Sequence, residues 1–155
     1  MKVFLLERTQ RLKISPDKAW EFFSNPANLS LITPAEMRFD ITSELPKRMY
    51  AGQIITYTVR PIMNLKVNWV TEITQVREPE FFCDSQLLGP YRLWNHQHHF
   101  IPISGGIEMR DIIHYAIPFG WIGWLANAIV VRRKLEYIFD YRKKYLADKF
   151  GELPG

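Results

Sequence analysis

The chain has 155 residues and a net charge of +4, and 14% of its residues are aromatic. This length suits one domain with a substantial core, and a single cysteine, Cys83, excludes an intrachain disulfide or a cysteine-rich zinc module. The basic residues form no nucleic-acid-binding motif, so we expect no nucleic-acid partner. The longest largely apolar stretch, 117–131, is too short to span a membrane. The apolar run that begins at Val3 is too short for a signal peptide, so we expect a cytoplasmic protein.

The first part of the chain predicts one strand followed by two short helices. The strand is expected over residues 2–14. Ser15, Pro16 and Asp17 then supply an N-cap, a proline at the first helical position and an acid in the first turn, which together indicate a helix start. A second short helix is expected over residues 26–32. The apolar side chains that share one side of the first helix are Ala19, Trp20 and Phe23.

The rest of the chain predicts further strands and a long final helix. Apolar side chains alternate in segments separated by glycine or proline, which is the pattern of strands with one buried face: 37–41, 55–59, 65–73, 81–87, 94–100 and 107–117. The alternation places Cys83 inward beside Phe81, as a buried small hydrophobe. Near-helical spacing predicts one helix over about 123–150, with its basic residues, Arg142 among them, on a solvated face. Its apolar stripe comprises Leu125, Ile129, Val131, Leu135, Ile138, Tyr145 and Leu146.

The stretch 94–117 is the most informative part of the sequence, because it predicts a hairpin with a defined register. Gly105 and Gly106 supply turn chemistry. With the turn over 103–106, His98 and Asp111 face each other, at a Cβ separation of about 4.5–5.5 Å. A turn one residue longer or shorter would break this His–Asp pairing. The other opposed pairs are Trp94 with Tyr115, His96 with Ile113, and Phe100 with Met109.

The order of elements predicts an α+β fold. Seven antiparallel strands with one apolar face need a cover, and the final helix is the only predicted element long enough to provide it. A strongly curved sheet wrapped around a single helix leaves a cavity between the two layers. The polar groups of the hairpin face this space in such an arrangement.

Several motifs resemble the SRPBCC (START/Bet v 1-like) superfamily. Residues 15–23, SPDKAWEFF, and 25–34, NPANLSLITP, resemble the first helix of these proteins and the segment after it. Residues 94–100, WNHQHHF, resemble the WxHxHxF strand of a stand-alone bacterial branch. Residues 111–118 resemble the DxVxYxxP strand of that branch, and residues 132–142 resemble its RRxLxxIFxYR helix.

The resemblance implies one helix-grip domain over residues 1–150, followed by a short tail over 151–155. It also implies that a polyketide cyclase-like cavity binds a small hydrophobic ligand (a lipid, a polyketide-like or an isoprenoid compound) without a cofactor. Fold by itself does not fix function. The candidate ligand-binding residues are Tyr57, Trp69, Trp94, His96, His98, Phe100, Met109, Asp111 and Tyr115.

Two further functions stay open. In a cyclase- or aromatase-type enzyme, His98 oriented by Asp111 would move a proton on the bound molecule. Alternatively, the segment from Trp121 to Trp124, near the basic residues 132–134, would form a membrane- or protein-interaction surface with transient contact to an anionic membrane. A metal site is a separate possibility, because a His₂-carboxylate set is formed by His96, His98 and Asp111. Three ligands at this spacing are weak evidence for a metal, and we expect none.

Overall fold

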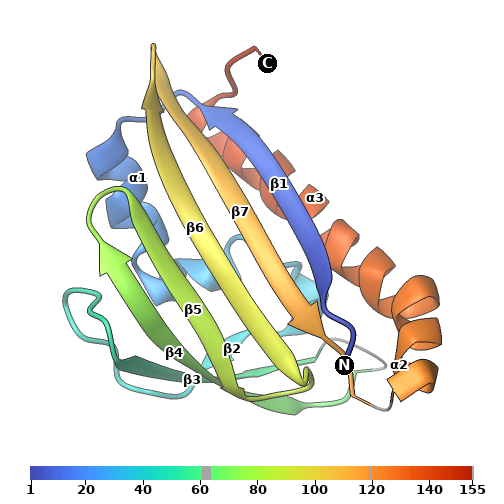
Figure 1. Cartoon of the computed structure of the whole chain (residues 1–155). Helices are drawn as coiled ribbons and strands as arrows, with labels where there is room; N and C mark the ends of the chain where they lie inside the picture. The colour runs from blue at the N-terminus through green and yellow to red at the C-terminus, as the bar shows by residue number, and fades with distance from the viewer. Residues whose placement is uncertain (61–63, 119, 155) are drawn as a thin grey trace.

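The computed structural model describes residues 1–60, 64–118 and 120–154, without the side chains of residues 123, 124, 127 and 128. The described residues form a curved seven-stranded antiparallel sheet with the order β1-β7-β6-β5-β4-β3-β2 (Figure 1). Register shifts between β4 and β5 mark bulges, which bend a sheet. The strands are β1 (Phe4–Leu12), β2 (Asp40–Ile41), β3 (Gln53–Val59), β4 (Val67–Arg77), β5 (Phe81–Leu88), β6 (Leu93–Ile103) and β7 (Gly106–Ala116).

The helix α1 (Pro16–Phe23) begins where the sequence predicts. The hydroxyl of Ser15 accepts the backbone N–H of Lys18, which satisfies one of the free donors at the helix start. The three apolar residues expected on its inner side are buried, and Trp20 packs edge-on against Phe82 and Phe100 of the sheet. Two short 3₁₀ helices follow, η1 (Pro26–Ser30) and η2 (Ala35–Met37).

The predicted final helix consists of three pieces: α2 (Gly120–Ala126), a π-helical segment η3 (Asn127–Val131) and α3 (Arg132–Phe150). The side chains of α3 pack against the concave face of the sheet, where Leu135 and Phe139 form a cluster with Leu6, Ile113 and Tyr115. No helix in the described part of the chain is long and apolar enough to cross a membrane. The α+β helix-grip arrangement expected from the order of elements is confirmed.

The buried stripe of the final helical region differs from the predicted one. Leu125 and Ile129 are 57% and 53% exposed, although the periodicity placed both inside. The physical reason is the π-helical segment, whose wider turn breaks the phase of the helix before α3 begins. The buried residues of α3 are Leu135, Phe139, Arg142 and Leu146. Arg142 therefore lies inside, and its interpretation as part of a solvated face is wrong.

The hairpin of β6 and β7 has the predicted register, with His98 opposite Asp111. Gly105 turns the chain with φ +81°, a backbone conformation that residues other than glycine rarely adopt. Gly106 lies against the backbone carbonyl of Leu12, so a Cβ atom has no room there. The turn thus depends on two glycines, for two different reasons.

Two expectations for the remaining strands are wrong. Met37 belongs to η2, and the strand predicted over 37–41 shrinks to the two residues of β2. In β5 the alternation has the opposite phase, because Asp84 pairs with His96 and Cys83 pairs with Gln97. Cys83 is still buried, but on the outer side of the sheet, where its thiol contacts Asn95.

Candidate functional site

A cavity of about 440 Å³ lies between the concave face of the sheet and α3. This volume is within the range of about 300–1,000 Å³ that is usual for small-molecule sites. Its walls come from α1, η1, η2, strands β3 to β6, the residues after β7, the ends of α2 and η3, and α3. Most of these residues are apolar, and the groups with carboxylate, imidazole or cationic side chains are Asp84, His96, His98, Lys134 and Arg142.

Aromatic rings form one side of the cavity. Trp69 stacks on Tyr57 at a centroid distance of 5.8 Å and meets Trp94 edge-on at 5.6 Å. The Tyr57 hydroxyl lies 3.0 Å from the Thr71 hydroxyl, and burial raises the pKa of Tyr57, so this phenol stays protonated. The indole Nε1 of Trp69 is buried without a hydrogen-bond partner among the described residues. This wall therefore offers a large apolar surface with one unsatisfied donor.

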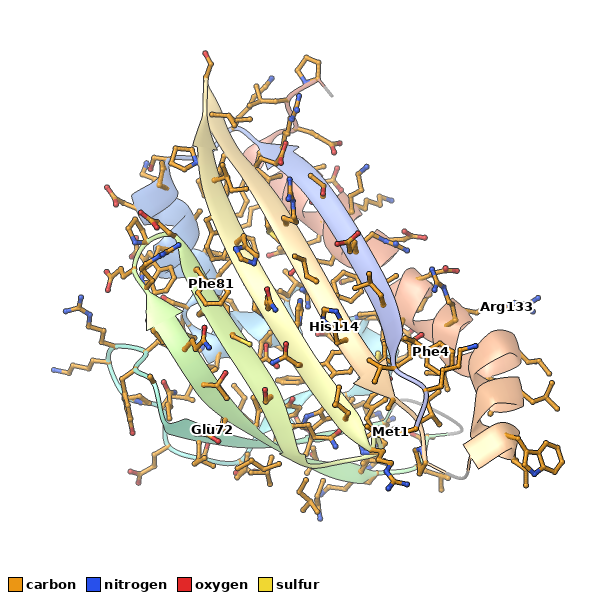
Figure 2. The ribbon with its side chains drawn as sticks, viewed as in Figure 1. Met1, Phe4, Glu72, Phe81, His114 and Arg133 are labelled. Carbon is orange, nitrogen blue, oxygen red and sulfur yellow. The ribbon has the colours of Figure 1, made fainter. Side chains whose placement is uncertain are left out.

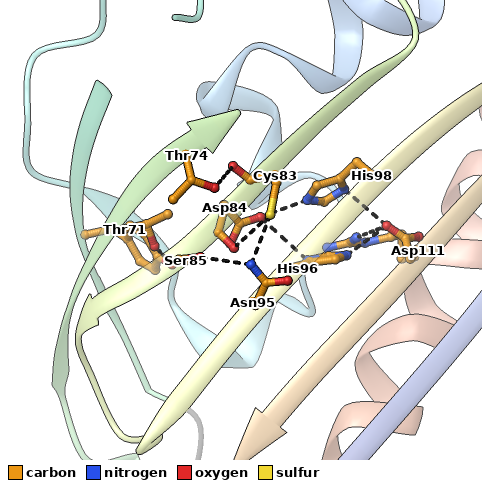
Figure 3. A network of polar contacts seen from close by, with 11 residues as sticks. Thr71, Thr74, Cys83, Asp84, Ser85, Asn95, His96, His98 and Asp111 are labelled. Carbon is orange, nitrogen blue, oxygen red and sulfur yellow. Dashed lines mark hydrogen bonds and ion pairs between the residues drawn. The ribbon is translucent and has the colours of Figure 1, made fainter. Parts of the chain in front are cut away.

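A compact polar network lies beside this wall (Figure 3). Asp111 Oδ1 accepts a hydrogen bond from His96 Nε2 at 2.9 Å and lies 3.1 Å from His98 Nδ1, with poorer alignment. Asp84 Oδ2 lies 2.9 Å from His98 Nε2 and 3.7 Å from His96 Nδ1. The two carboxylates thus lie on opposite sides of the two imidazoles.

Packing holds these imidazoles in position. Phe82 stacks on His98 at a centroid distance of 4.1 Å, and Phe139 meets His96 edge-on at 5.8 Å. Arg142 of α3 lies over the Phe139 ring, with its Nη1 atom 3.7 Å from Asp111 Oδ1. The network is therefore held by side chains of β5, β6, β7 and α3.

The pKa values of the network move in opposite directions. Burial, together with repulsion by His98, lowers the pKa of His96 to about 4. Burial also opposes the charging of His98, but its contacts with Asp111 and Asp84 outweigh this effect and raise its pKa. The pKa values of Asp84 and Asp111 are lowered despite burial, since both carboxylates accept hydrogen bonds from imidazoles. At neutral pH, His96 is neutral and the two carboxylates are charged.

The structure separates the sequence-predicted site residues into two groups. The predicted residues that line the cavity are Tyr57, Trp69, Trp94, His96 and His98. Those outside its lining, all nearly fully buried, are Phe100, Met109, Asp111 and Tyr115. Asp111 thus lies behind the two imidazoles, and the well-aligned hydrogen bond of His98 is with Asp84 instead.

Sequence reasoning missed Asp84 and Arg142. The paired part of β5 and β6 ends at Ser85 and Asn95, well before the connection between the strands, so that connection does not set their register and the inward position of Asp84 had no local signal. Arg142 did have a local signal in the sequence. It shares one helix face, with spacings of four, three and four residues, with Leu135, Phe139 and Leu146. An arginine within such a stripe indicates a buried carboxylate partner.

A comparison of the sequence with protein-family models finds no match, and no curated protein matches it. Several solved structures share the fold. Protein CV1439 from Chromobacterium violaceum superimposes with a TM-score of 0.71 and 12% identity, over 97% of this chain and 98% of its own. The ginseng major latex-like protein 151 from Panax ginseng superimposes with a TM-score of 0.68 and 14% identity, over 98% of this chain and 99% of its own. Ara h 8.0201 superimposes with a TM-score of 0.60 and 12% identity, over 95% of this chain and 99% of its own. The chain therefore shares the helix-grip fold of these structures.

Proposed function

We propose that this protein binds a small hydrophobic molecule in the cavity between the sheet and α3. The observation that carries the proposal is the cavity itself: about 440 Å³, mostly apolar, with its imidazole and carboxylate groups gathered in one network. Apolar burial would provide the affinity, at about 25 cal/mol for each Å² removed from water. The polar network would fix the orientation of the molecule.

The donors in the cavity wall indicate what the ligand carries. The Trp69 Nε1 atom has no partner among the described residues, and an oxygen atom of a ligand would satisfy it. The polar network lies beside this wall and also borders the cavity. A largely apolar molecule with a carbonyl or hydroxyl oxygen fits such a lining. The lipids, polyketide-like and isoprenoid compounds implied by the resemblance to the WxHxHxF branch belong to this class.

The proposal is tested by identifying what the protein carries. The chain is purified natively from its own host, extracted with organic solvent and analysed by mass spectrometry. Ile138→Trp places an indole at the cavity wall, and Ile101→Trp makes the same change at an exposed position of β6. We expect one apolar compound per chain in the original protein and in the Ile101→Trp control, and its loss in Ile138→Trp.

A fluorescent apolar probe, 1-anilinonaphthalene-8-sulfonate, supplies an independent measurement with purified protein. We expect saturable binding that is weakened by Ile138→Trp and unchanged by Ile101→Trp. The absence of both a copurified compound and saturable probe binding would contradict the proposal. Equal binding to both tryptophan variants would contradict it as well.

An enzyme of the cyclase or aromatase type is a second candidate, and one observation favours it. A purely structural histidine would be sealed from the cavity behind Trp94 and Phe100, whereas His98 lines the cavity. Between Asp84 and Asp111, it is oriented to give or take a proton. If the copurified compound is a substrate, His98→Gln should abolish its conversion while binding remains. Conversion at an unchanged rate would exclude this role.

The α2–η3 segment, residues 120–131, supports a third candidate, docking on an anionic membrane. Trp121 is 72% exposed, and other apolar side chains of the segment are exposed beside it. Arg132 and Arg133 follow directly, and Arg133 points away from the body of the protein (Figure 2). Exposed apolar side chains beside cations are the features of an interfacial helix. The side chain of Trp124 lies outside the described residues.

Sedimentation with vesicles tests this docking. We expect binding to phosphatidylserine-containing vesicles at low salt, and weaker binding at high salt because exposed charges are screened. Trp121→Ala should weaken binding, while Tyr50→Ala, at an exposed aromatic of another region, should not. Absence of binding at low salt, or equal effects of the two variants, would exclude this role.

A further inference from the structure

Three potential ligand atoms converge at the edge of the cavity: His96 Nδ1, His98 Nε2 and Asp84 Oδ2. The group of Asp84, His96 and His98 offers one ligand atom from each residue, all within 4.8 Å of one another. All three residues also line the cavity. The set weighed from the sequence, where no metal was expected, had Asp111 as its carboxylate, but Asp111 lies on the other side of the imidazoles (Figure 3).

Asp111 fixes the direction in which the imidazoles present their nitrogens. It accepts the Nε2–H of His96 at 2.9 Å and lies 3.1 Å from His98 Nδ1. The opposite nitrogen of each ring therefore points toward Asp84. This is the carboxylate–histidine arrangement that holds and orients histidine ligands in metal sites.

His96 Nδ1 and Asp84 Oδ2 face each other at 3.7 Å, too far apart for a hydrogen bond. The Nε2 atom of His96 is occupied by Asp111, whose charged carboxylate accepts from it at 2.9 Å. The Nδ1 atom is therefore the ring nitrogen directed at Asp84. A cation placed between this nitrogen and the carboxylate oxygen would bind both atoms.

The network contains two carboxylates, Asp84 and Asp111, and one guanidinium, that of Arg142. Asp111 is 2% exposed and the Asp84 side chain is 16% exposed, and Arg142 Nη1 lies 3.7 Å from Asp111 Oδ1. His98 Nε2 and Asp84 Oδ2 are 2.9 Å apart. A metal ion would displace any proton between these two atoms, because His98 Nε2 must present its lone pair to bind the ion.

We propose that Asp84, His96 and His98 bind a divalent first-row transition-metal ion at the edge of the apolar cavity. Two histidines and one carboxylate suit Zn²⁺ or Fe²⁺, and they leave coordination positions open to water or to another molecule. The open positions face the cavity, so an oxygen atom of a bound molecule can complete the coordination. The metal site does not depend on the proposed hydrophobic ligand and is tested with the metal alone.

The test is a titration of chelator-treated, tag-free protein with Co²⁺, followed by visible absorption, and with Zn²⁺, followed by calorimetry. We expect one ion per chain and the d–d absorption of low-coordinate Co²⁺, displaced by Zn²⁺. His98→Ala should remove binding, and His99→Ala should leave it unchanged, because His99 is adjacent in β6 but outside the ligand set.

Two isosteric variants keep the test valid if His98→Ala fails to fold. Asp111→Asn should lower the Zn²⁺ affinity about 10- to 100-fold, the usual effect of losing a carboxylate behind a histidine ligand. Asp84→Asn should lower it at least as much, since it removes the anionic ligand. Circular dichroism establishes that each variant is folded.

Three results would overturn the metal site. The first is no binding of Co²⁺ or Zn²⁺ to the original protein. The second is binding that persists unchanged in folded Asp84→Asn. The third is binding that depends on His99 rather than on His98. Loss of the hydrophobic ligand alone, with metal binding intact, would contradict the proposed function and leave the metal site standing.

Discussion

The polar network and the α2–η3 segment flank the same cavity, yet they are stabilised in different ways. In the network, Asp111 is 2% exposed and lies within 4 Å of three potential donors, on His96, His98 and Arg142. In the segment, Trp121 is 72% exposed. Buried groups that share hydrogen bonds and ion pairs are costly to disturb, whereas exposed apolar side chains contribute little to folding. The network is therefore expected to be rigid, and the segment is free to contact something outside the chain.

Removal of a carboxylate from the network should have the largest effect. Asp111→Ala leaves Arg142 and the two imidazoles without their buried counter-charge, and we expect a loss of about 3–5 kcal/mol in the free energy of unfolding. Urea denaturation measures it. Asp140→Ala, at an exposed position of α3, should change stability by less than about 0.5 kcal/mol. Equal effects of the two alanines would show that the network is not buried as described.

One substitution made in both regions tests the contrast directly. Leu146 is fully buried in α3, so Leu146→Ala should cost about 2–5 kcal/mol. Leu125 of α2 is 57% exposed, and Leu125→Ala should cost less than about 0.5 kcal/mol. Chemical denaturation of both variants gives the difference. A large cost at Leu125 would mean that the segment is packed against something within the folded chain.

A substitution in the turn that sets the register of β6 and β7 should lower the stability by a smaller amount. Gly106→Ala forces a Cβ atom against the Leu12 carbonyl, and overpacking of this kind costs about 1–3 kcal/mol. Ser104→Ala, at an exposed position in the same turn, serves as the control. We expect a lower thermal unfolding midpoint for Gly106→Ala than for Ser104→Ala. If Gly106→Ala were as stable as the control, the close approach to β1 would be refuted.

The smallest effect is expected at the exposed ion pair next to the segment. Arg132 Nε lies 3.0 Å from Glu136 Oε1, and both side chains are at least 40% exposed. Glu136→Gln should therefore cost about 0.5 kcal/mol or less, and high salt should remove the difference. A cost comparable to that of Asp111→Ala would erase the distinction between the two regions.

The sequence alone determined the fold class, the start of the first helix and the pairing of His98 with Asp111. Each of these follows from a local cause. Ser15 caps the first turn of α1 and Pro16 occupies its first position, so neighbouring residues alone fix where the helix begins. The two-glycine turn fixes which residues of β6 and β7 are opposed, because strand register follows directly from turn length.

Only the tertiary structure decided which other groups join that pair. Asp84 comes from a strand whose connection to β6 sets no register. Arg142 belongs to the regular inner stripe of α3, but only the packing of α3 on the sheet brings it to Asp111. Both side chains reach the imidazoles through packing between elements far apart in the sequence. Local patterns specify the period and register of neighbouring strands. The meeting of β5, β6, β7 and α3 around His96 and His98 depends on how the sheet curves around the helix, which no local pattern encodes.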